Sequence, residues 1–306
     1  MPRILQLRGL GSLAAGERHR LPSGLPEDRD ELIRTNRIQR NCILVFVLVL
    51  PTLAALRLQS VSDTVTSDEV KLILQRSVEA GKTSWKAAPA YEYVETDVQK
   101  DGGTKTFAEL MILGSPYERL IAIDGKPLSP EQEAQEQKKL TATISRRRNE
   151  SPDERSQRLA KYEKVRKRDH SLMEEFTKAF DFACIGEQEV GGREAYILEA
   201  TPRPGYQPPN RETEVLKGTK GRLWIDKQSF NWVKAEAEVI KPVPIVGFLA
   251  RVEPGTHFEL DAMPISNDVW LPSHFSMKTR AKVLLVFSHE SQADESYYGY
   301  HEAAQY

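Results

Sequence analysis

The chain has 306 residues, with 43 Lys and Arg, 44 Asp and Glu, and a formal net charge of −1. This balance argues against a general nucleic-acid binder, which carries a basic surplus, so no nucleic-acid partner is expected. The length fits one large domain. The two cysteines, Cys42 and Cys184, allow no intrachain disulfide once the N-terminus is removed, so they do not indicate a compartment.

The N-terminus carries an apolar run, Cys42 to Leu56, that follows three arginines and precedes a polar stretch. This order is typical of a secretory signal, and the run is shorter than the about 20 residues of a usual membrane span. A cleaved signal is favoured over an uncleaved single-span anchor and over a buried core helix. We therefore expect a disordered extension at 1–40, a signal sequence or membrane anchor at 41–60, and a binding domain at 61–306. The expected location is the periplasm, with the protein either exported or held in the inner membrane by the anchor.

The first part of the binding domain reads as a helix and a meander. Thr66 and Glu69 have capping-box spacing, and the apolar stripe Val70 to Val78 behind them predicts a helix over about 67–81. Strands are predicted at "AYEYVETDV" (90–98), "TFAELMIL" and "YERLIAI", with turns at "DGG" and "GSP".

From Ser129 to about Phe180 the pattern is helical. The stretch "SPEQEAQEQKKL" begins one helix with serine, proline and acids, Pro152 ends it, and apolar residues at helical spacing predict a second. Twelve Lys and Arg lie between Lys138 and Arg168. They indicate either a contact with anionic lipid or a solvated helix face, and the interspersed acids favour the solvated face.

Strands return after Phe180. A hairpin is predicted at "FACIGEQEV" and "EAYILEA", followed by a proline-rich loop and a short helical piece at "RETEVLKG". A second hairpin is predicted at "GRLWIDKQSFNWVKAEAEV" (221–239), then two long strands around "EPGT" (253–256) and a long strand at "FSMKTRAKVLLVF". The tail "ESYYGYHEAAQY" is expected to add an edge strand or to fray.

The later strands alternate apolar and polar side chains, which predicts an α+β fold with an antiparallel sheet that has one apolar and one hydrated face. Alternation places Trp224 and Trp232 on the hydrated face, for rim packing or for a partner. The alanines of the apolar face leave room for helix packing, the favoured interpretation, or for an open apolar cavity. The residues predicted to line such a cavity are Leu223, Ile225, Val233, Ala235, Ala237, Val239, Phe248, Ala250, Phe258, Leu260, Ala281, Val283 and Leu285.

The sequence gives little support for a catalytic, cofactor-binding or metal-binding motif. "AGKTS" (80–84) lacks the glycine five places before Gly81 that a phosphate-binding loop needs, and it lies at a predicted helix end. His257, Glu259 and Asp261 alternate with apolar residues, which favours a solvated strand face over a metal site. Cys184 is interpreted as a buried thiol. We expect no enzyme activity, no cofactor and no metal.

Four stretches, "LIAIDGKPLS", "GREAYILEATPRPGY", "KGRLWIDKQSFNWVKAEAEV" and "VWLPSHFSMKTRAK", and the order of elements over roughly 67–290, resemble the LolA-like family. That family includes carriers that sort lipoproteins to the outer membrane and a periplasmic stress-sensing regulator. The resemblance implies a curved half-barrel sheet, LolA/LolB-like, with helices over an apolar concave face that binds lipid. It implies acyl chains or a lipoprotein as cargo, outer-membrane lipoprotein sorting, and contact with a membrane or a membrane protein. The alternative is a membrane-tethered periplasmic sensor or interaction module without cargo.

Overall fold

The computed structural model describes residues 65–210, 213–244, 250–283 and 287–306, without the side chains of 169, 172, 283 and 287. The predicted extension and the signal or anchor, 1–60, lie outside the described residues. No helix within the described ranges is both long and apolar enough to span a membrane.

The described residues hold three α-helices, each of which begins with a capping box. They are α1 (Ser67–Ala87), α2 (Pro130–Arg148) and α3 (Pro152–Ala179), and their caps pair Thr66 with Glu69, Ser129 with Gln132 and Ser151 with Glu154. Each box satisfies two N–H groups that the helix start would otherwise leave without a partner. Two 3₁₀ turns, η2 (Ala88–Ala90) and η3 (Glu214–Gly218), complete the helical elements.

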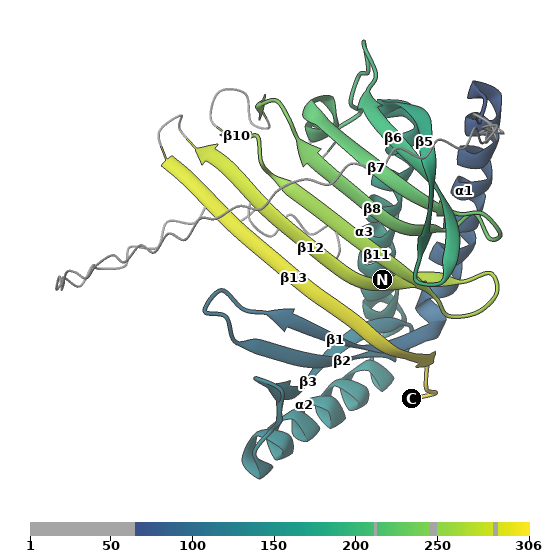
Figure 1. The fold of residues 1–306 in the computed structure, drawn as a ribbon. Helices are drawn as coiled ribbons and strands as arrows, with labels where there is room; N and C mark the ends of the chain where they lie inside the picture. The colour runs from purple at the N-terminus through teal and green to yellow at the C-terminus, as the bar shows by residue number, and fades with distance from the viewer. Residues whose placement is uncertain (1–64, 211–212, 245–249, 284–286) are drawn as a thin grey trace, which may run out of the picture. The chain divides into compact units, whose positions relative to one another are not determined.

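The described strands form one open antiparallel sheet in the order β4-β3-β2-β1-β13-β12-β11-β8-β7-β6-β5, with β10 paired to β12 and to β9 (Figure 1). The strands are β1 (Tyr91–Val98), β2 (Thr104–Ile112), β3 (Ser115–Ile123), β4 (Lys126–Pro127), β5 (Phe180–Val190), β6 (Arg193–Pro202), β7 (Thr219–Asp226), β8 (Trp232–Val239), β9 (Val243–Pro244), β10 (Ala250–Val252), β11 (His257–Pro264), β12 (Trp270–Val283) and β13 (Phe287–Glu302). The predicted meander and hairpins are present, which confirms the α+β class.

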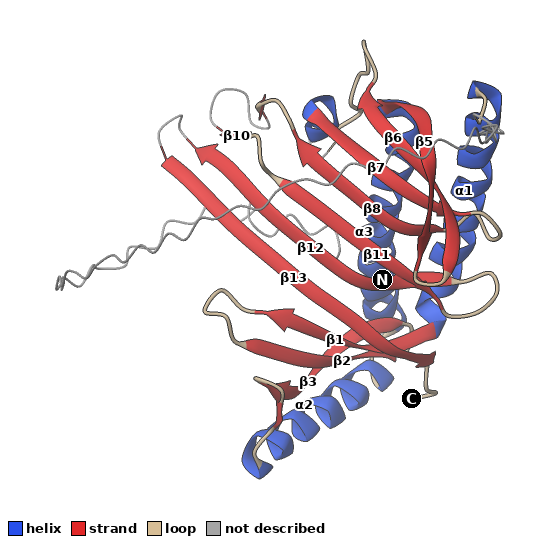
Figure 2. Ribbon diagram, viewed as in Figure 1, coloured by secondary structure: helices blue, strands red, loops and turns tan. Residues whose placement is uncertain are grey.

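Helices α1 and α3 lie against one face of the sheet, and α2 lies beside β3 (Figure 2). The main core forms where Val70 and Ile73 of α1 pack on Leu198, Leu223 and Ile225 of β6 and β7. The helices therefore cover the apolar face of the sheet, as the alternation of the strands predicts.

Two arginines fix the corner between α2 and α3 to the turn between β2 and β3. The guanidinium of Arg147 is buried and donates to the carbonyl oxygens of Ile112 and Ser115, at 2.8 and 2.7 Å. Arg158 forms a two-pronged ion pair with Glu150, with a shortest N–O distance of 2.7 Å. Helix α3 thus begins at a fixed point and runs back over the sheet toward β5.

Three element predictions need correction. The C-terminal tail is no edge strand, because β13 lies inside the sheet between β1 and β12; its apolar residues are too few to show the alternation of a buried strand. In the segment before "EPGT", the residues that the structure describes from 250 on form β10, which pairs with β12 instead of β11. Helix α1 continues past the predicted end at 81 to Ala87, since Gly81 does not terminate it.

Candidate functional site

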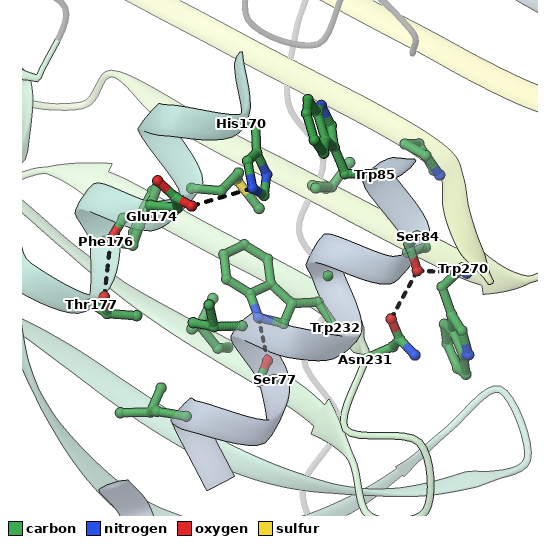
Figure 3. Close-up of a pocket in the computed structure, with 18 of the residues that line it drawn as sticks. Ser77, Ser84, Trp85, His170, Glu174, Phe176, Thr177, Asn231, Trp232 and Trp270 are labelled. Carbon is green, nitrogen blue, oxygen red and sulfur yellow. Dashed lines mark hydrogen bonds and ion pairs between the residues drawn. The ribbon is translucent and has the colours of Figure 1, made fainter. Parts of the chain in front are cut away.

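An apolar cavity of about 160 Å³ lies between α1, α3 and the sheet (Figure 3). We call it the α1–α3 cavity. Its lining residues are Leu74, Ser77, Val78, Gly81, Ser84 and Trp85 of α1, His170, Met173, Glu174, Phe176 and Thr177 of α3, and Phe182, Leu223, Asn231, Trp232, Leu260, Ala262, Trp270, Leu271 and Pro272 on the sheet side. An apolar protein cavity of about 150 Å³ stays dry and binds benzene. In this conformation the cavity therefore has room for a small apolar group.

Gly81 opens the α1–α3 cavity on the α1 side. It lies inside the helix and is exposed, and a β-carbon at this position would meet no atom within 4 Å. A glycine inside a helix costs about 1 kcal/mol relative to alanine, and neither a turn nor a close neighbour requires one here. Its missing side chain leaves the space open toward solvent, where Glu174 of α3 is also exposed.

Trp232 enters the cavity from the sheet. Strand β8 pairs with β7 at Lys234 and next at Trp232, so Val233 is skipped and the ladder is bulged. The bulge turns Trp232 toward the helices, where its Nε1 donates to Oγ of Ser77 at 2.8 Å and its ring meets that of Phe176 edge-on at 6.1 Å. The placement of Trp232 on the hydrated face is therefore wrong, because a bulge resets the alternation from which it was predicted.

The side chains of Ser77, Ser84 and Asn231 in the cavity wall are bonded to the protein itself, whereas the buried Nε1 of Trp85 has no partner among the described residues. Oγ of Ser84 donates to Oδ1 of Asn231 at 3.1 Å and accepts from the backbone N–H of Trp270 at 3.0 Å (Figure 3). The Ser77 hydroxyl is already bonded to Trp232. Because these groups have partners, an apolar ligand would leave none of them unsatisfied.

Trp85 ties α1 to α3 beside the cavity. His170 stacks on its indole ring at 4.5 Å with an angle of 12° between the planes. The guanidinium of Arg166 lies 4.5 Å from the same ring and donates to the Trp85 carbonyl oxygen at 2.5 Å. We call Trp85, Arg166 and His170 the Trp85 clasp. Burial lowers the pKa of His170 despite the carboxylate of Glu174 at 3.4 Å, so the imidazole is neutral at pH 7.

The predicted lining residues lie in several parts of the core. Leu223 and Leu260 line the α1–α3 cavity. Leu223, Ala235, Ala237 and Phe258 line a second space of about 10 Å³, which Phe176 and Phe180 cover. That volume is about the minimum for one water molecule. The helices therefore fill much of the apolar face and leave the α1–α3 cavity open beside them.

The remaining predicted residues pack elsewhere. Ile225 is part of the core under α1, Val233 packs with Trp224 and Trp270, Val239 packs with Val243 and Val252, and Ala250 and Ala281 are buried in β10 and β12. Phe248 and Leu285, together with the side chain of Val283, lie outside the described residues.

The groups weighed as metal ligands or reactive side chains have other partners. Glu259 is ion-paired with Lys234 at 2.5 Å, and Asp261 lies 3.7 Å from His274. Cys184 is half-buried and packs against the core under α1.

An acidic cluster lies at the junction of the first and last strands of the sheet. Carboxylate oxygens of Glu95, Asp97 and Glu295 lie within 4.8 Å of one another. Burial and the neighbouring carboxyl groups raise the pKa of Glu95 to about 10, so its side chain is protonated at neutral pH. Because β1 and β13 stand at opposite ends of the described chain, local sequence patterns do not reveal this cluster.

The sequence matches no family model and no curated protein. Sixteen chains of solved structures resemble this one, and three of them illustrate the match. A DUF1329 family protein from Desulfovibrio piger is 14% identical over 76% of this chain and 92% of that one. A putative outer membrane lipoprotein-sorting protein domain from Vibrio parahaemolyticus is 11% identical over 74% of this chain and 92% of that one, and a LolA superfamily protein from Nitrosomonas europaea is 10% identical over 77% and 94%. The TM-score is 0.28 for each of the three.

Two of the three carry outer membrane lipoprotein-sorting or LolA superfamily names, which is the family that the sequence resembles. At these identities and TM-scores, the similarity says nothing of what the α1–α3 cavity binds.

Proposed function

We propose that this protein binds the acyl chain of a lipid or lipoprotein in the α1–α3 cavity. The observation that carries the proposal is the cavity itself, which has largely apolar walls, Ser77 and Ser84 hydroxyls bonded within the protein, and an opening at Gly81. No reactive group is needed for such a role. The site therefore supports a binding protein instead of an enzyme, and outer-membrane lipoprotein sorting is the role that we propose for it.

The size of the cavity limits what the present conformation can hold. A group of about six carbons gains roughly 5 kcal/mol from burial at 0.8 kcal/mol per methylene, which the cost of association largely cancels. A chain of about fifteen methylenes would gain roughly 12 kcal/mol, but about 160 Å³ cannot enclose it. Binding of a full acyl chain therefore requires α1 and α3 to separate, and the Trp85 clasp is the contact that would open.

A chain-length series tests this proposal. Delipidated protein is titrated with an apolar fluorescent dye and then with saturated fatty acids of increasing length as competitors. If the helices separate, affinity rises about fourfold per methylene well beyond six carbons; if the cavity is rigid, the gain stops near that length. Triacylated lipopeptides in place of fatty acids distinguish lipoprotein cargo from free lipid.

The alternative is a membrane-tethered sensor or interaction module without cargo. It predicts that neither dye nor fatty acid binds saturably and that the natively purified protein contains no extractable lipid. Absence of saturable binding together with absence of extractable lipid would lead us to abandon the carrier proposal.

We also propose that the domain at 61–306 acts in the periplasm, behind a signal or anchor at 41–60. N-terminal sequencing of the native protein from the periplasmic and membrane fractions tests this placement. A chain that begins near residue 1 in the cytoplasmic fraction alone would contradict it.

A further inference from the structure

The chain carries a strong separation of charge that the cavity does not explain. Residues 138–168, in the second half of α2 and the first part of α3, hold 12 Lys and Arg and four Asp and Glu. All other residues of 57–306 hold 23 Lys and Arg and 35 Asp and Glu. We propose that the exposed side of residues 138–168 is a docking surface for an anionic lipid bilayer.

Three of the four acids of this segment are engaged in contacts within it. Glu150 is paired with Arg158, and Glu163 lies 2.9 Å from Arg166. The carboxylate of Glu154 accepts a hydrogen bond from the backbone N–H of Ser151 at the start of α3. These contacts are local and leave the outer cations unneutralised. Six exposed cations make no ion pair with any residue that the structure describes: Lys138, Arg146, Arg148, Arg155, Lys161 and Lys164.

Helix α3 presents cations on the side opposite the cavity. At 100° per residue, Lys161 and Lys164 point 120–180° away from His170, which lines the α1–α3 cavity. Lys164 and His170 are six residues apart, which is about 9 Å along the helix axis. One helix therefore carries both cations of the proposed surface and, on another side, a wall of the cavity.

A bilayer fits this surface better than a nucleic acid or an acidic peptide. The cations are spread over the exposed sides of two helices. The α1–α3 cavity lies on the other side of α3, away from these cations. The only aromatic residue of 138–168 is Tyr162, whose hydroxyl is buried, so bases would find no stacking surface. A diffuse cluster of Lys and Arg beside an acidic body is the pattern that orients a protein on anionic lipid.

The experiment compares partition of the full chain onto vesicles with about 30 mol% phosphatidylglycerol and onto pure phosphatidylcholine vesicles at about 0.1 M salt. The test variant carries K138Q, R155Q, K161Q and K164Q. The matched control carries K100Q, K105Q, K220Q and K241Q, which removes the same charge from exposed positions outside α2 and α3. The readout is the ratio of the two partition coefficients, which cancels any binding that does not depend on lipid charge. Circular dichroism and thermal unfolding verify that both variants fold.

We expect the ratio to fall about fivefold per removed cation, hence at least a hundredfold in the test variant and little in the control. Equal ratios in the wild type and the test variant would overturn the proposal. So would an equal fall in both variants, which would report net charge alone. If wild type shows no vesicle preference but is retained on polyglutamate through the same cations, the partner is an acidic protein segment and the bilayer proposal is wrong. None of these outcomes depends on cargo binding, so failure here and failure of the carrier proposal are distinguishable.

Discussion

Replacement of Gly81 by leucine offers a sharp test of the cavity. Because a β-carbon at this position meets nothing within 4 Å, the new side chain enters open space at the cavity. Helix propensity favours leucine over glycine by about 0.8 kcal/mol, and half-burial of its side chain adds about 1 kcal/mol. The free energy of unfolding should rise by about 2 kcal/mol, which raises Tm by about 4–8 °C.

The same substitution should weaken ligand binding. Four added carbons take the place of about four methylenes of the ligand, which costs about 3 kcal/mol or roughly a hundredfold in Kd. Differential scanning calorimetry measures the change in stability, and the dye titration with fatty-acid competitors measures the change in affinity on the same sample. The matched control is Gln75→Leu, on an exposed position of α1 that does not line the cavity. If Gly81→Leu destabilises the protein, the leucine does not enter open space. If the variant binds the ligand as tightly as the control does, the cavity is not the binding site.

Three further predictions concern stability. Burial raises the pKa of Glu95 to about 10, so the contribution of Glu95 to stability is fully present below pH 4.5 and is lost as pH rises from 4.5 toward 10. Glu95→Gln should remove that loss, worth up to about 3 kcal/mol at pH 7, and identical urea curves at pH 7 would contradict this. Asp226→Ala should cost about 3 kcal/mol in urea unfolding, because the buried carboxylate accepts from Arg193 at 2.7 and 2.9 Å and from the backbone N–H groups of Gln228 and Ser229. A cost under 1 kcal/mol would refute the role of Asp226 in the β7–β8 turn. Trp232→Phe should lower the free energy of unfolding by about 1 kcal/mol, because the hydrogen bond to Ser77 is lost. The smaller ring also enlarges the cavity, so tighter dye binding should accompany the lower Tm. Unchanged dye affinity would count against the place of Trp232 in the cavity wall.

Local signals predicted the helices and hairpins well because their determinants lie close in sequence. The pair Thr66 and Glu69 marks the start of α1, and the alternation in β7 and β11 identifies the apolar face on which Leu223 and Leu260 line the cavity. The end of α1 was missed because Gly81 reads as a helix breaker, although it is the residue that opens the cavity.

The walls of the cavity could not be predicted from strand alternation. A bulge brings Trp232 to the helix face, and no residue type in "NWVK" announces it. Trp85 and His170 are 85 residues apart in the sequence, so only the fold brings the two rings together. Leu74 and Val78 of α1, and Met173 and Phe176 of α3, belong to the apolar spacing that predicts the two helices, and they are also helical walls of the site.

The most direct test of acyl-chain binding uses the four tryptophans of the chain. Two variants retain one tryptophan each, with the others replaced by phenylalanine: Trp232, which lines the α1–α3 cavity, or Trp224, which packs in a separate cluster with Val233 and Ala195. A fatty acid brominated along its chain is then titrated against the fluorescence of each variant. An acyl chain in the cavity should quench Trp232 saturably and leave Trp224 nearly unchanged. Equal quenching of the two, or quenching of neither, would contradict the account.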